Sequence, residues 1–409
     1  MKTIFYVGKP YLHRDALLRL KSAGYTLGIL HDISLVLKNK DIFDHIIELD
    51  YSSERSFKKS LEEAADVPKI DGLLCPYENY IVFKAIAAET LSLPSLSIDS
   101  ARACTDKYLM RSRFLRYNTA ITPEFTFVDS EQQLLDFAER VGYPLILKPT
   151  NLVKSLLVTK CSTKDELLLA YKNTLEQIND IYIKLHVTNR APGLILEKFI
   201  EGRMCSVAAF VDQDGTPHFC DGIVDLVTAQ DIGYDDNFLY ARKLLNDFDP
   251  VLKAKIFKVA REGIAALDMR SSPAHVEIIY NDAEVQLVEI GARTGGYRPF
   301  LYMQSYGIDM LEQEARNAVG DQPRMNGVFK NYAALYELFP RSRSTFLKLE
   351  NLQPKTSYAY LHEVAHPGDE VGCAKDGYKS LAIIGIADPD IASFTARSNA
   401  IEDIQVVTT

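Results

Sequence analysis

The fold of the central part of this 409-residue chain is decided by two apolar runs that each carry one acid: AHVEIIY (Ala274–Tyr280) and VQLVEIGARTGG (Val285–Gly296). They flank the turn-forming stretch Asn281–Glu284, so we expect an antiparallel hairpin. If the loop has three residues, Glu277 falls directly opposite Glu289 and their carboxylates share one face. A two-residue loop would shift the register by one and send the two carboxylates to opposite faces.

Two carboxylates that face each other repel, and Ile279 and Leu287 beside them indicate a partly buried face. A divalent cation between Glu277 and Glu289 would offset this repulsion. Mg²⁺ is commonly held by one or two carboxylates and completes its shell with phosphate oxygens and water. The alternative interpretations are an exposed face with two solvated glutamates, or one glutamate that carries a proton.

Three basic residues extend this pattern. Lys148 ends the predicted strand PLILKP, and Lys107 lies in the first turn of a helix predicted over 106–116. A cation at a helix start opposes the macrodipole unless an anion binds there as well. Arg293 follows Glu289 by four residues, which places both on one side of an extended strand. Two acids with three cations indicate a site for a metal and nucleotide phosphates, although each lysine alone is more typical of a solvated surface.

The chain divides into three regions by its secondary-structure pattern. Residues 1–100 alternate strands with helices expected at about 14–23, 54–65 and 81–91, which predicts an open parallel α/β domain. Gly8 stands alone after the first strand, so the dinucleotide-binding fingerprint is missing. Residues 101–320 lead from strand and helix units into antiparallel hairpins, an α+β pattern, and residues 321–409 predict a small β-rich unit.

Composition restricts the class of protein. Hydrophobic residues at 47% and charged residues at 25% are typical of a globular chain, and a net charge of −9 favours neither nucleic acid nor an anionic membrane surface as partner. The six cysteines lack the close pairs of a zinc site. The opening segment MKTIFYVGKPYLHRD has too short an apolar run for a secretory signal, and no run reaches the ~18 residues of a spanning helix. We expect a cytoplasmic protein that acts on small molecules.

Candidate substrate contacts follow the hairpin. Gly295 and Gly296 precede a helix predicted to continue through Asn317, and bare amides at a helix entry can bind a carboxylate together with Tyr297 and Arg298. The alternative is a tight turn next to a surface arginine. A second candidate lies in the first domain, where Glu78 follows a predicted strand at the sheet edge that binds ligands in open α/β folds. It is expected to meet a substrate amine or to be solvated.

Five motifs occur in order between about residues 106 and 296: DKYLMRSRFL, GYPLILKP, LILEKFIEG, HVEI and VEIGARTGG. In this order and spacing the chain resembles the ATP-grasp superfamily of carboxylate–amine ligases, and within it the L-amino-acid ligases that join two amino acids into a dipeptide. The resemblance implies a mixed α/β and α+β three-domain architecture. It consists of an N-terminal open parallel domain (1–100), a central ATP-grasp domain (101–320) with a mobile lid at about 146–200, and a small β-rich C-terminal unit (321–409).

The resemblance also implies roles for individual residues. Lys107 and Lys148 would contact ATP phosphates, aided by Ser155 in the covering loop 150–155. Glu277 and Glu289 would bind magnesium, with manganese as an alternative, and Arg293 would stabilise charge on the transferring phosphoryl group. The implied adenine-side hinge is Glu197, Lys198, Phe199 and Ile200. The implied substrate contacts are Glu78, Gly295, Gly296, Tyr297 and Arg298.

The implied activity is ATP-dependent formation of a peptide or amide bond between a small carboxylate and a small amine, through an acyl phosphate. A homodimer is compatible with this resemblance. Two alternatives stay open: a ligase of the purine-biosynthesis type, and a nucleotide-binding ATP-grasp protein without turnover. Three positions depart from the usual pattern. Gly291 replaces a metal-binding asparagine, Met204 replaces a glutamate, and the loop 150–155 contains no glycine.

Overall fold

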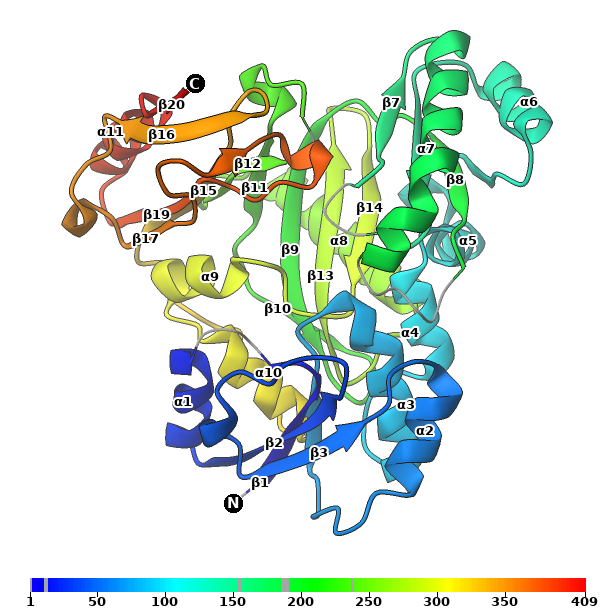
Figure 1. Ribbon diagram of the computed structural model, residues 1–409, viewed down its shortest axis with the longest axis vertical. Coiled ribbons are helices and arrows are strands. Elements are labelled where there is room, and N and C mark those ends of the chain that lie inside the picture. Colours follow the sequence, from blue (N-terminus) through cyan, green and yellow to red (C-terminus); the bar gives the residue numbers. More distant parts are fainter. Residues whose placement is uncertain (1, 11–13, 153–155, 185–190, 237) are drawn as a thin grey trace.

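The computed structural model describes residues 2–10, 14–152, 156–184, 191–236 and 238–409 (Figure 1). Its N-terminal domain is a parallel sheet in the order β3-β2-β1-β4. The strands are β1 (Lys2–Gly8), β2 (Tyr25–Asp32), β3 (His45–Leu49) and β4 (Gly72–Leu74), and the connecting helices are α1 (Arg14–Ser22), α2 (Glu54–Glu62) and α3 (Ile81–Leu91). The predicted open parallel domain is therefore confirmed.

Local sequence signals explain where the helices of this domain begin. Ser53 caps α2 by accepting a hydrogen bond from the Ser56 amide, and Phe57 and Leu61, one turn apart, are buried. Residues 93–98 (LPSLSI) form no strand, because Ser97 caps the next helix, α4 (Ile98–Thr105). Asp106 then ends α4 and caps α5 (Lys107–Tyr117), accepting hydrogen bonds from the Tyr108 and Leu109 amides.

A large antiparallel sheet forms the centre of the molecule. Its order is β14-β13-β9-β11-β12-β15-β19-β17, with β10 beside β9. The strands are β9 (Arg203–Val211), β10 (Pro217–Phe219), β11 (Val224–Thr228), β12 (Leu239–Leu244), β13 (Ser272–Tyr280), β14 (Val285–Gly291), β15 (Tyr332–Leu338), β17 (Tyr360–Glu363) and β19 (Ala382–Asp388). Helix α8 (Pro250–Ala266) packs on β13 and β14. Strands from the C-terminal region thus continue the central sheet.

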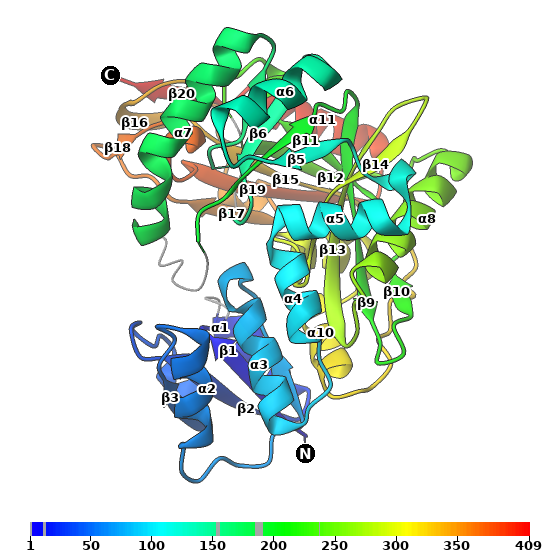
Figure 2. The same ribbon diagram turned by 90° about the vertical axis from the view of Figure 1, so that its right-hand side faces the viewer.

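A smaller antiparallel sheet lies beside the hairpin of β13 and β14 (Figure 2). Its order is β5-β8-β6-β7, from β5 (Phe125–Phe127), β6 (Leu145–Pro149), β7 (Thr159–Cys161) and β8 (Leu194–Lys198). Helices α6 (Glu131–Val141) and α7 (Lys164–Lys184) cover it. The chain ends in a peripheral unit of β16 (Ser344–Glu350), β18 (Glu370–Val371), β20 (Gln405–Thr408) and α11 (Ile391–Glu402). The mixed α/β and α+β fold class is confirmed.

One prediction about the segment after the hairpin was wrong. The single helix expected through Asn317 is two helices, α9 (Arg298–Tyr306) and α10 (Met310–Ala318), because Gly307 ends the first in a left-handed conformation and Asp309 caps the second. The helix also begins two residues after Gly296, since Tyr297 has a φ of 61° and stands outside it. The glycine amides therefore precede the helix and are not part of its first turn.

Candidate active site

The hairpin of β13 and β14 places Glu277 opposite Glu289, as predicted, although the loop has a different length. Tyr280 pairs with Val285, so the loop has four residues and would by itself shift the register by one. A bulge next to Glu277 and Ile278 shifts it back, because Ile278 pairs with Leu287 while Glu277 pairs with Glu289. The shared face that the sequence predicted is thus restored by an irregularity that the sequence does not reveal.

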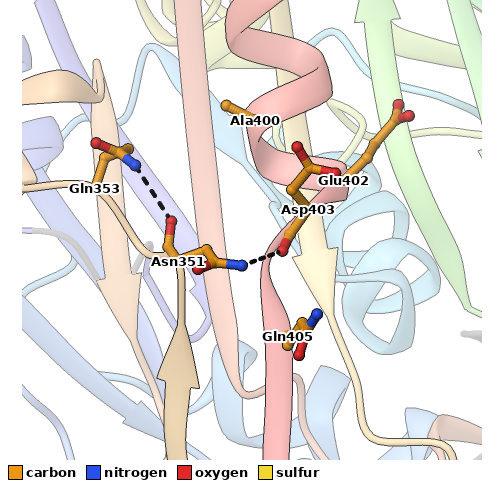
Figure 3. A pocket seen from close by; sticks show the side chains of 6 residues that line it. All are labelled: Asn351, Gln353, Ala400, Glu402, Asp403 and Gln405. Carbon is orange, nitrogen blue, oxygen red and sulfur yellow. Dashed lines mark hydrogen bonds between the residues drawn. The ribbon is translucent and has the colours of Figure 1, made fainter.

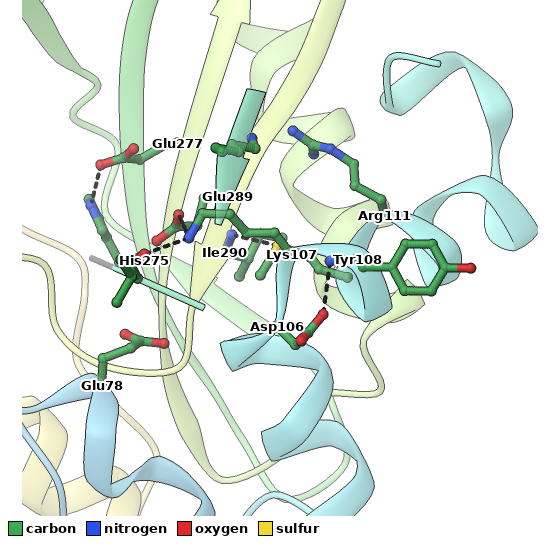
Figure 4. A network of polar contacts seen from close by, with 12 residues as sticks. Glu78, Asp106, Lys107, Tyr108, Arg111, His275, Glu277, Glu289 and Ile290 are labelled. Atoms are coloured by element: carbon green, nitrogen blue, oxygen red, sulfur yellow. Dashed lines mark hydrogen bonds and ion pairs between the residues drawn. The ribbon is translucent and has the colours of Figure 1, made fainter. Parts of the chain in front are cut away.

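Lys107 approaches the acid pair from α5. Its Nζ lies 3.2 Å from Glu289 Oε2 (Figure 4). The same Nζ donates a hydrogen bond to the Leu152 carbonyl at 2.9 Å. The Lys107 amide is bonded to the Thr150 carbonyl at 2.6 Å. One residue therefore links the acid pair to the start of the loop that follows β6. Ser155, predicted to help bind phosphate from that loop, lies outside the described residues.

Glu277 is held by the side chain two residues earlier on the same strand. His275 Nε2 lies 3.1 Å from Glu277 Oε1, and both side chains are largely buried. Burial opposes ionisation of Glu277, but the hydrogen bond with His275 and the fields of Arg298 and Arg293 keep its pKa below the usual range. Burial also lowers the pKa of His275. Glu277 thus has His275 as a hydrogen-bonding neighbour, and Glu289 has Lys107 as a cationic neighbour.

A buried cluster of three charged side chains begins at Arg111, one helical turn after Lys107 on α5. Glu197 on β8 forms two hydrogen bonds with Arg111, at 2.8 and 3.2 Å, and an ion pair with Lys148 Nζ at 2.7 Å. All three side chains are at most 7% exposed. Sequence reasoning missed Arg111, although it stands four residues after Lys107 and therefore on the same face of α5. Two cations share one carboxylate here, which leaves this end of the site positively charged.

Glu197 is therefore expected to stabilise the fold strongly. Burial raises the pKa of Glu197, but Arg111 and Lys148 outweigh it and lower the pKa to about 2, against ~4.3 in an unfolded chain. The resulting stability is present above about pH 4.3 and is lost as pH falls through about 2. Glu197→Gln should lower the free energy of unfolding by about 3 kcal/mol at pH 7 in urea titrations. The matched control Glu124→Gln, in a pair whose side chains are 54–60% exposed, should change it by less than about 1 kcal/mol.

Arg293 connects the central domain to the N-terminal domain. Its Nε donates to Glu78 Oε2 at 3.0 Å, and the two side chains are 20% and 10% exposed. Although burial acts against its charge, the fields of Glu78, Glu289 and Glu277 raise the pKa of Arg293. The predicted neighbourhood of Arg293 and the acid pair is therefore found. Glu78, expected to meet a substrate amine, instead contacts Arg293 in this structure.

Arg298 is a buried cation at the start of α9. It is 2% exposed, and its guanidinium donates to Ser206 Oγ at 2.9 and 3.1 Å and to the Gly296 carbonyl at 3.0 Å. No carboxylate of the described residues forms an ion pair with it, and burial lowers its pKa to about 10. An anion supplied by a ligand would offset this desolvated charge. The glycines do form a tight turn, because the Arg298 amide donates to the Gly295 carbonyl at 3.3 Å, but Arg298 is not the surface residue of that alternative.

Tyr297 and Gly295 have structural contacts of their own. Tyr297 Oη donates to Glu337 at 3.2 Å, and Arg242, which is paired with Glu337 at 2.8 Å, lies over the Tyr297 ring. A Cβ on Gly295 would come within 2.5 Å of His275 Nδ1, so only glycine fits against that ring. Around Gly296, by contrast, a Cβ would meet nothing within 4 Å. Gly296 is therefore the glycine with open space beside it.

The predicted adenine-side stretch follows β8. The Glu197 side chain is committed to the buried charge cluster, and the amides of Lys198 and Phe199 donate to the Glu124 and Pro144 carbonyls at 2.9 and 3.1 Å. Ile200 has no such backbone bond among the described residues. If this stretch binds a base, its backbone donor is therefore the Ile200 amide.

The acid pair is chemically suited to a divalent cation. Lys107 lies against Glu289 and His275 against Glu277, so positive or hydrogen-bonding groups already stand where a cation would offset the facing carboxylates. Within the described ranges, no group of three or more His, Cys, Asp or Glu side chains is arranged to hold a metal. A metal here would use Glu277 and Glu289 as its protein ligands and complete its shell with phosphate and water, as Mg²⁺ commonly does.

A separate surface hollow of about 470 Å³ lies in the peripheral C-terminal unit (Figure 3). Its lining is Asn351, Gln353, Ala400, Glu402, Asp403 and Gln405. These six residues include two acids and no base, which does not suit a phosphate. The chemistry is therefore assigned to the cluster around Glu277 and Glu289.

In the described part of the chain, no helix has the length and apolar character needed to cross a membrane.

Comparisons with known proteins agree with this geometry. The ATP-grasp domain model matches residues 141–299. The alanine–anticapsin ligase of Bacillus subtilis is 24% identical over 303 residues, which are 68% of this chain and 62% of that protein. The chain thus spans less than two thirds of the length of this curated relative.

Two solved structures share the fold over nearly their whole length. An L-amino acid ligase from Bacillus licheniformis has a TM-score of 0.80 at 18% identity, covering 100% of this chain and 99% of the other. N5-carboxyaminoimidazole synthetase from Staphylococcus aureus, complexed with ADP, has a TM-score of 0.70 at 13% identity, covering 98% and 97%. The residues matched by the domain model include Lys148, Glu197, Glu277, Glu289 and Arg293.

Proposed function

We propose that this chain is an ATP-dependent ligase of the ATP-grasp type that joins a carboxylate and an amine, each from an amino acid, into an amide. The observation that carries the proposal is the acid pair Glu277 and Glu289 with Lys107, Arg293 and Arg298 around it. The names of two relatives, an alanine–anticapsin ligase and an L-amino acid ligase, support the same substrate class.

ATP is proposed to bind between the small sheet and the hairpin. Lys107 and Lys148 would each exchange a carboxylate partner for a phosphate oxygen, which is a stronger acceptor with more charge. Arg111 would stay on Glu197 and keep that carboxylate neutralised when Lys148 turns to the nucleotide. Mg²⁺ or Mn²⁺, held by Glu277 and Glu289, would neutralise charge on the phosphates.

The remaining residues are proposed to handle the two substrates. The first substrate's carboxylate oxygen attacks the γ-phosphorus, the bond to the β-phosphate oxygen breaks, and an acyl phosphate and ADP result. The neutral amine of the second substrate then attacks the acyl carbon, phosphate leaves, and the amine loses a proton. Arg293 would stabilise negative charge in both steps. Arg298, buried beside the open space at Gly296, would bind the free carboxylate of the amine substrate.

The proposal is tested by ADP release from a panel of amino-acid pairs with Mg²⁺. ADP should form with certain pairs and should need both the carboxylate and the amine substrate, with one ADP for each amide made. ADP release only with phosphorylated ribosyl amines would favour the purine-biosynthesis type instead. Stoichiometric ATP binding without ADP release in the presence of every acceptor would favour a protein without turnover.

The binding of ATP should weaken at alkaline pH. Burial lowers the pKa of Lys148 to about 8 despite the attraction of Glu197, so Lys148 loses its charge as pH rises through about 8. If Lys148 contacts a phosphate, the Kd for ATP should rise by up to about tenfold between pH 8 and 9, measured by calorimetry. Lys148→Arg should remove this dependence, because arginine stays charged. An unchanged pH profile in Lys148→Arg would exclude Lys148 as its origin.

A further inference from the structure

His275 lies two residues before Glu277 on β13, so strand alternation places both side chains on the face that carries the acid pair. His275 Nε2 lies 3.1 Å from Glu277 Oε1 (Figure 4). An ionised carboxylate can only accept, so Nε2 carries the hydrogen and donates it. The other ring nitrogen, Nδ1, is buried and has no hydrogen-bond partner among the described residues. A second proton there would have no acceptor, which favours a neutral imidazole that donates from Nε2 alone.

The imidazole ring of His275 is also fixed by packing. Its side chain is 9% exposed. A Cβ on Gly295 would come within 2.5 Å of Nδ1 and 2.8 Å of two ring carbons, so the ring fills the space that a side chain at this position would need. Gly291 stands directly opposite His275 in the register and adds no side chain. The ring is therefore held in place by the backbone that follows the hairpin.

Each carboxylate of the acid pair has one oxygen with a protein partner. Glu277 Oε1 accepts from His275, and Glu289 Oε2 lies 3.2 Å from Lys107 Nζ. From the part of the chain that the structure describes, no hydrogen bond reaches Glu277 Oε2 or Glu289 Oε1. Each acid therefore keeps one oxygen for a cation. Single oxygens suit the tight octahedral shell of Mg²⁺, whereas Ca²⁺ is often bound by both oxygens of a carboxylate.

We propose that His275 is a positioning residue for the metal: it holds Glu277 Oε1 and so presents Oε2 to the cation, which favours Mg²⁺ or Mn²⁺ over Ca²⁺. The inference rests on the proposed function, in which Glu277 and Glu289 bind the metal. A hydrogen bond from a neighbouring group fixes the orientation of a metal ligand, and loss of such a group typically weakens metal binding roughly 10- to 100-fold. A contact that served only the fold would have no such effect.

The test measures how much a divalent cation tightens the binding of a β,γ-imido ATP analogue, by calorimetry in EDTA and in excess Mn²⁺. His275→Phe keeps a flat ring against Gly295 but removes the donor. In this variant the tightening by Mn²⁺ should fall at least about tenfold, while the Kd in EDTA stays within about twofold. The tightening by Ca²⁺ should fall less, so that the preference for Mn²⁺ narrows. His275→Gln, which keeps an N–H donor, should restore most of the Mn²⁺ effect.

Matched variants separate the hydrogen bond from general disturbance. Gly295→Ala should displace the imidazole and reduce the Mn²⁺ effect as His275→Phe does. Gly296→Ala should not reduce it, because a Cβ there meets nothing within 4 Å. His218→Phe removes a comparable contact, at 2.8 Å from Asp212, outside the acid cluster. It should leave the Mn²⁺ effect unchanged.

Two results would overturn the inference alone. One is a Mn²⁺ effect that Glu277→Gln abolishes but His275→Phe leaves intact. The other is an equal loss of analogue binding with and without metal in His275→Phe, because His275 would then act on the fold and not on the cation. Mn²⁺ that fails to tighten binding to the wild type would instead contradict the proposed metal site, and the inference with it. None of these measurements requires turnover, so they decide on His275 even if no amino-acid pair yields ADP.

Discussion

Glu289→Gln is expected to lower kcat for ADP release by about 10³-fold while the protein stays folded. Glutamine keeps the size of the side chain but removes the charge that would balance a divalent cation. Glu277 would then face an amide, and Lys107 would lose its partner at 3.2 Å. Activity should be measured at increasing Mg²⁺ concentration, because a weakened metal site requires more metal for the same rate.

The matched control for this variant is Glu284→Gln, since Glu284 is exposed at the loop of the same hairpin. It should leave both kcat and the Mg²⁺ requirement unchanged. Full Mg²⁺-dependent activity in Glu289→Gln would show that the metal assignment is wrong. An equal loss in both variants would indicate damage to the hairpin and not to a metal site.

Arg293→Met is expected to lower kcat by about 10³-fold, with a much smaller change in the Kd for ATP. Arg293 is proposed to stabilise charge that develops on the phosphoryl group, so its removal should affect the chemical step more than nucleotide binding. The variant also leaves the buried Glu78 without its 3.0 Å partner, which should lower stability.

The double variant Arg293→Met/Glu78→Gln separates these two effects. It removes the uncompensated charge of Glu78, so the melting temperature should recover while kcat stays low. Recovery of activity together with stability would mean that Arg293 serves only to join the two domains. Arg270→Met, at a half-exposed arginine two residues before β13 and outside the acid cluster, serves as the control for loss of a guanidinium.

The central cluster could be predicted from the sequence because strand alternation is a strong constraint. Two acids in adjacent Val- and Ile-rich strands have only two possible registers, and in one of them their side chains share a face. Arg293, four residues after the second acid, lies on the same side of its strand as that acid. The structure contains both registers: Glu277 lies opposite Glu289, as a three-residue loop would require, whereas Tyr280 pairs with Val285, as the two-residue alternative would require. The bulge beside Glu277 joins the two registers, and neither residue type nor spacing marks it in the sequence.

Contacts between distant segments could not be predicted in this way. The pairing of Glu78 with Arg293 joins residues 215 positions apart, and that of Arg111 with Glu197 joins residues 86 apart. Both depend on how separate elements of the fold pack against each other, which local periodicity does not encode. A partial signal existed for Arg111, which lies one helical turn after Lys107.

The departures from the family pattern fall at positions with specific neighbours. A Cβ on Gly291 would lie 3.4 Å from Glu78 Oε2, so Glu78 from the first domain stands closest to the place of the usual asparagine. The loop after β6, which lacks glycine, begins with Thr150 and Leu152 carbonyls bound to Lys107. These contacts fix the start of the loop on the same lysine that is proposed to bind phosphate.

The most direct test of the central claim is an isotope-transfer measurement on the carboxylate substrate. The carboxylate is labelled with ¹⁸O, the reaction is run with ATP, Mg²⁺ and the amine, and the released phosphate is examined by mass spectrometry. An acyl phosphate requires one ¹⁸O atom to pass from the carboxylate to each phosphate, and this is the predicted result. Phosphate without ¹⁸O, formed together with the amide, would contradict the proposed mechanism.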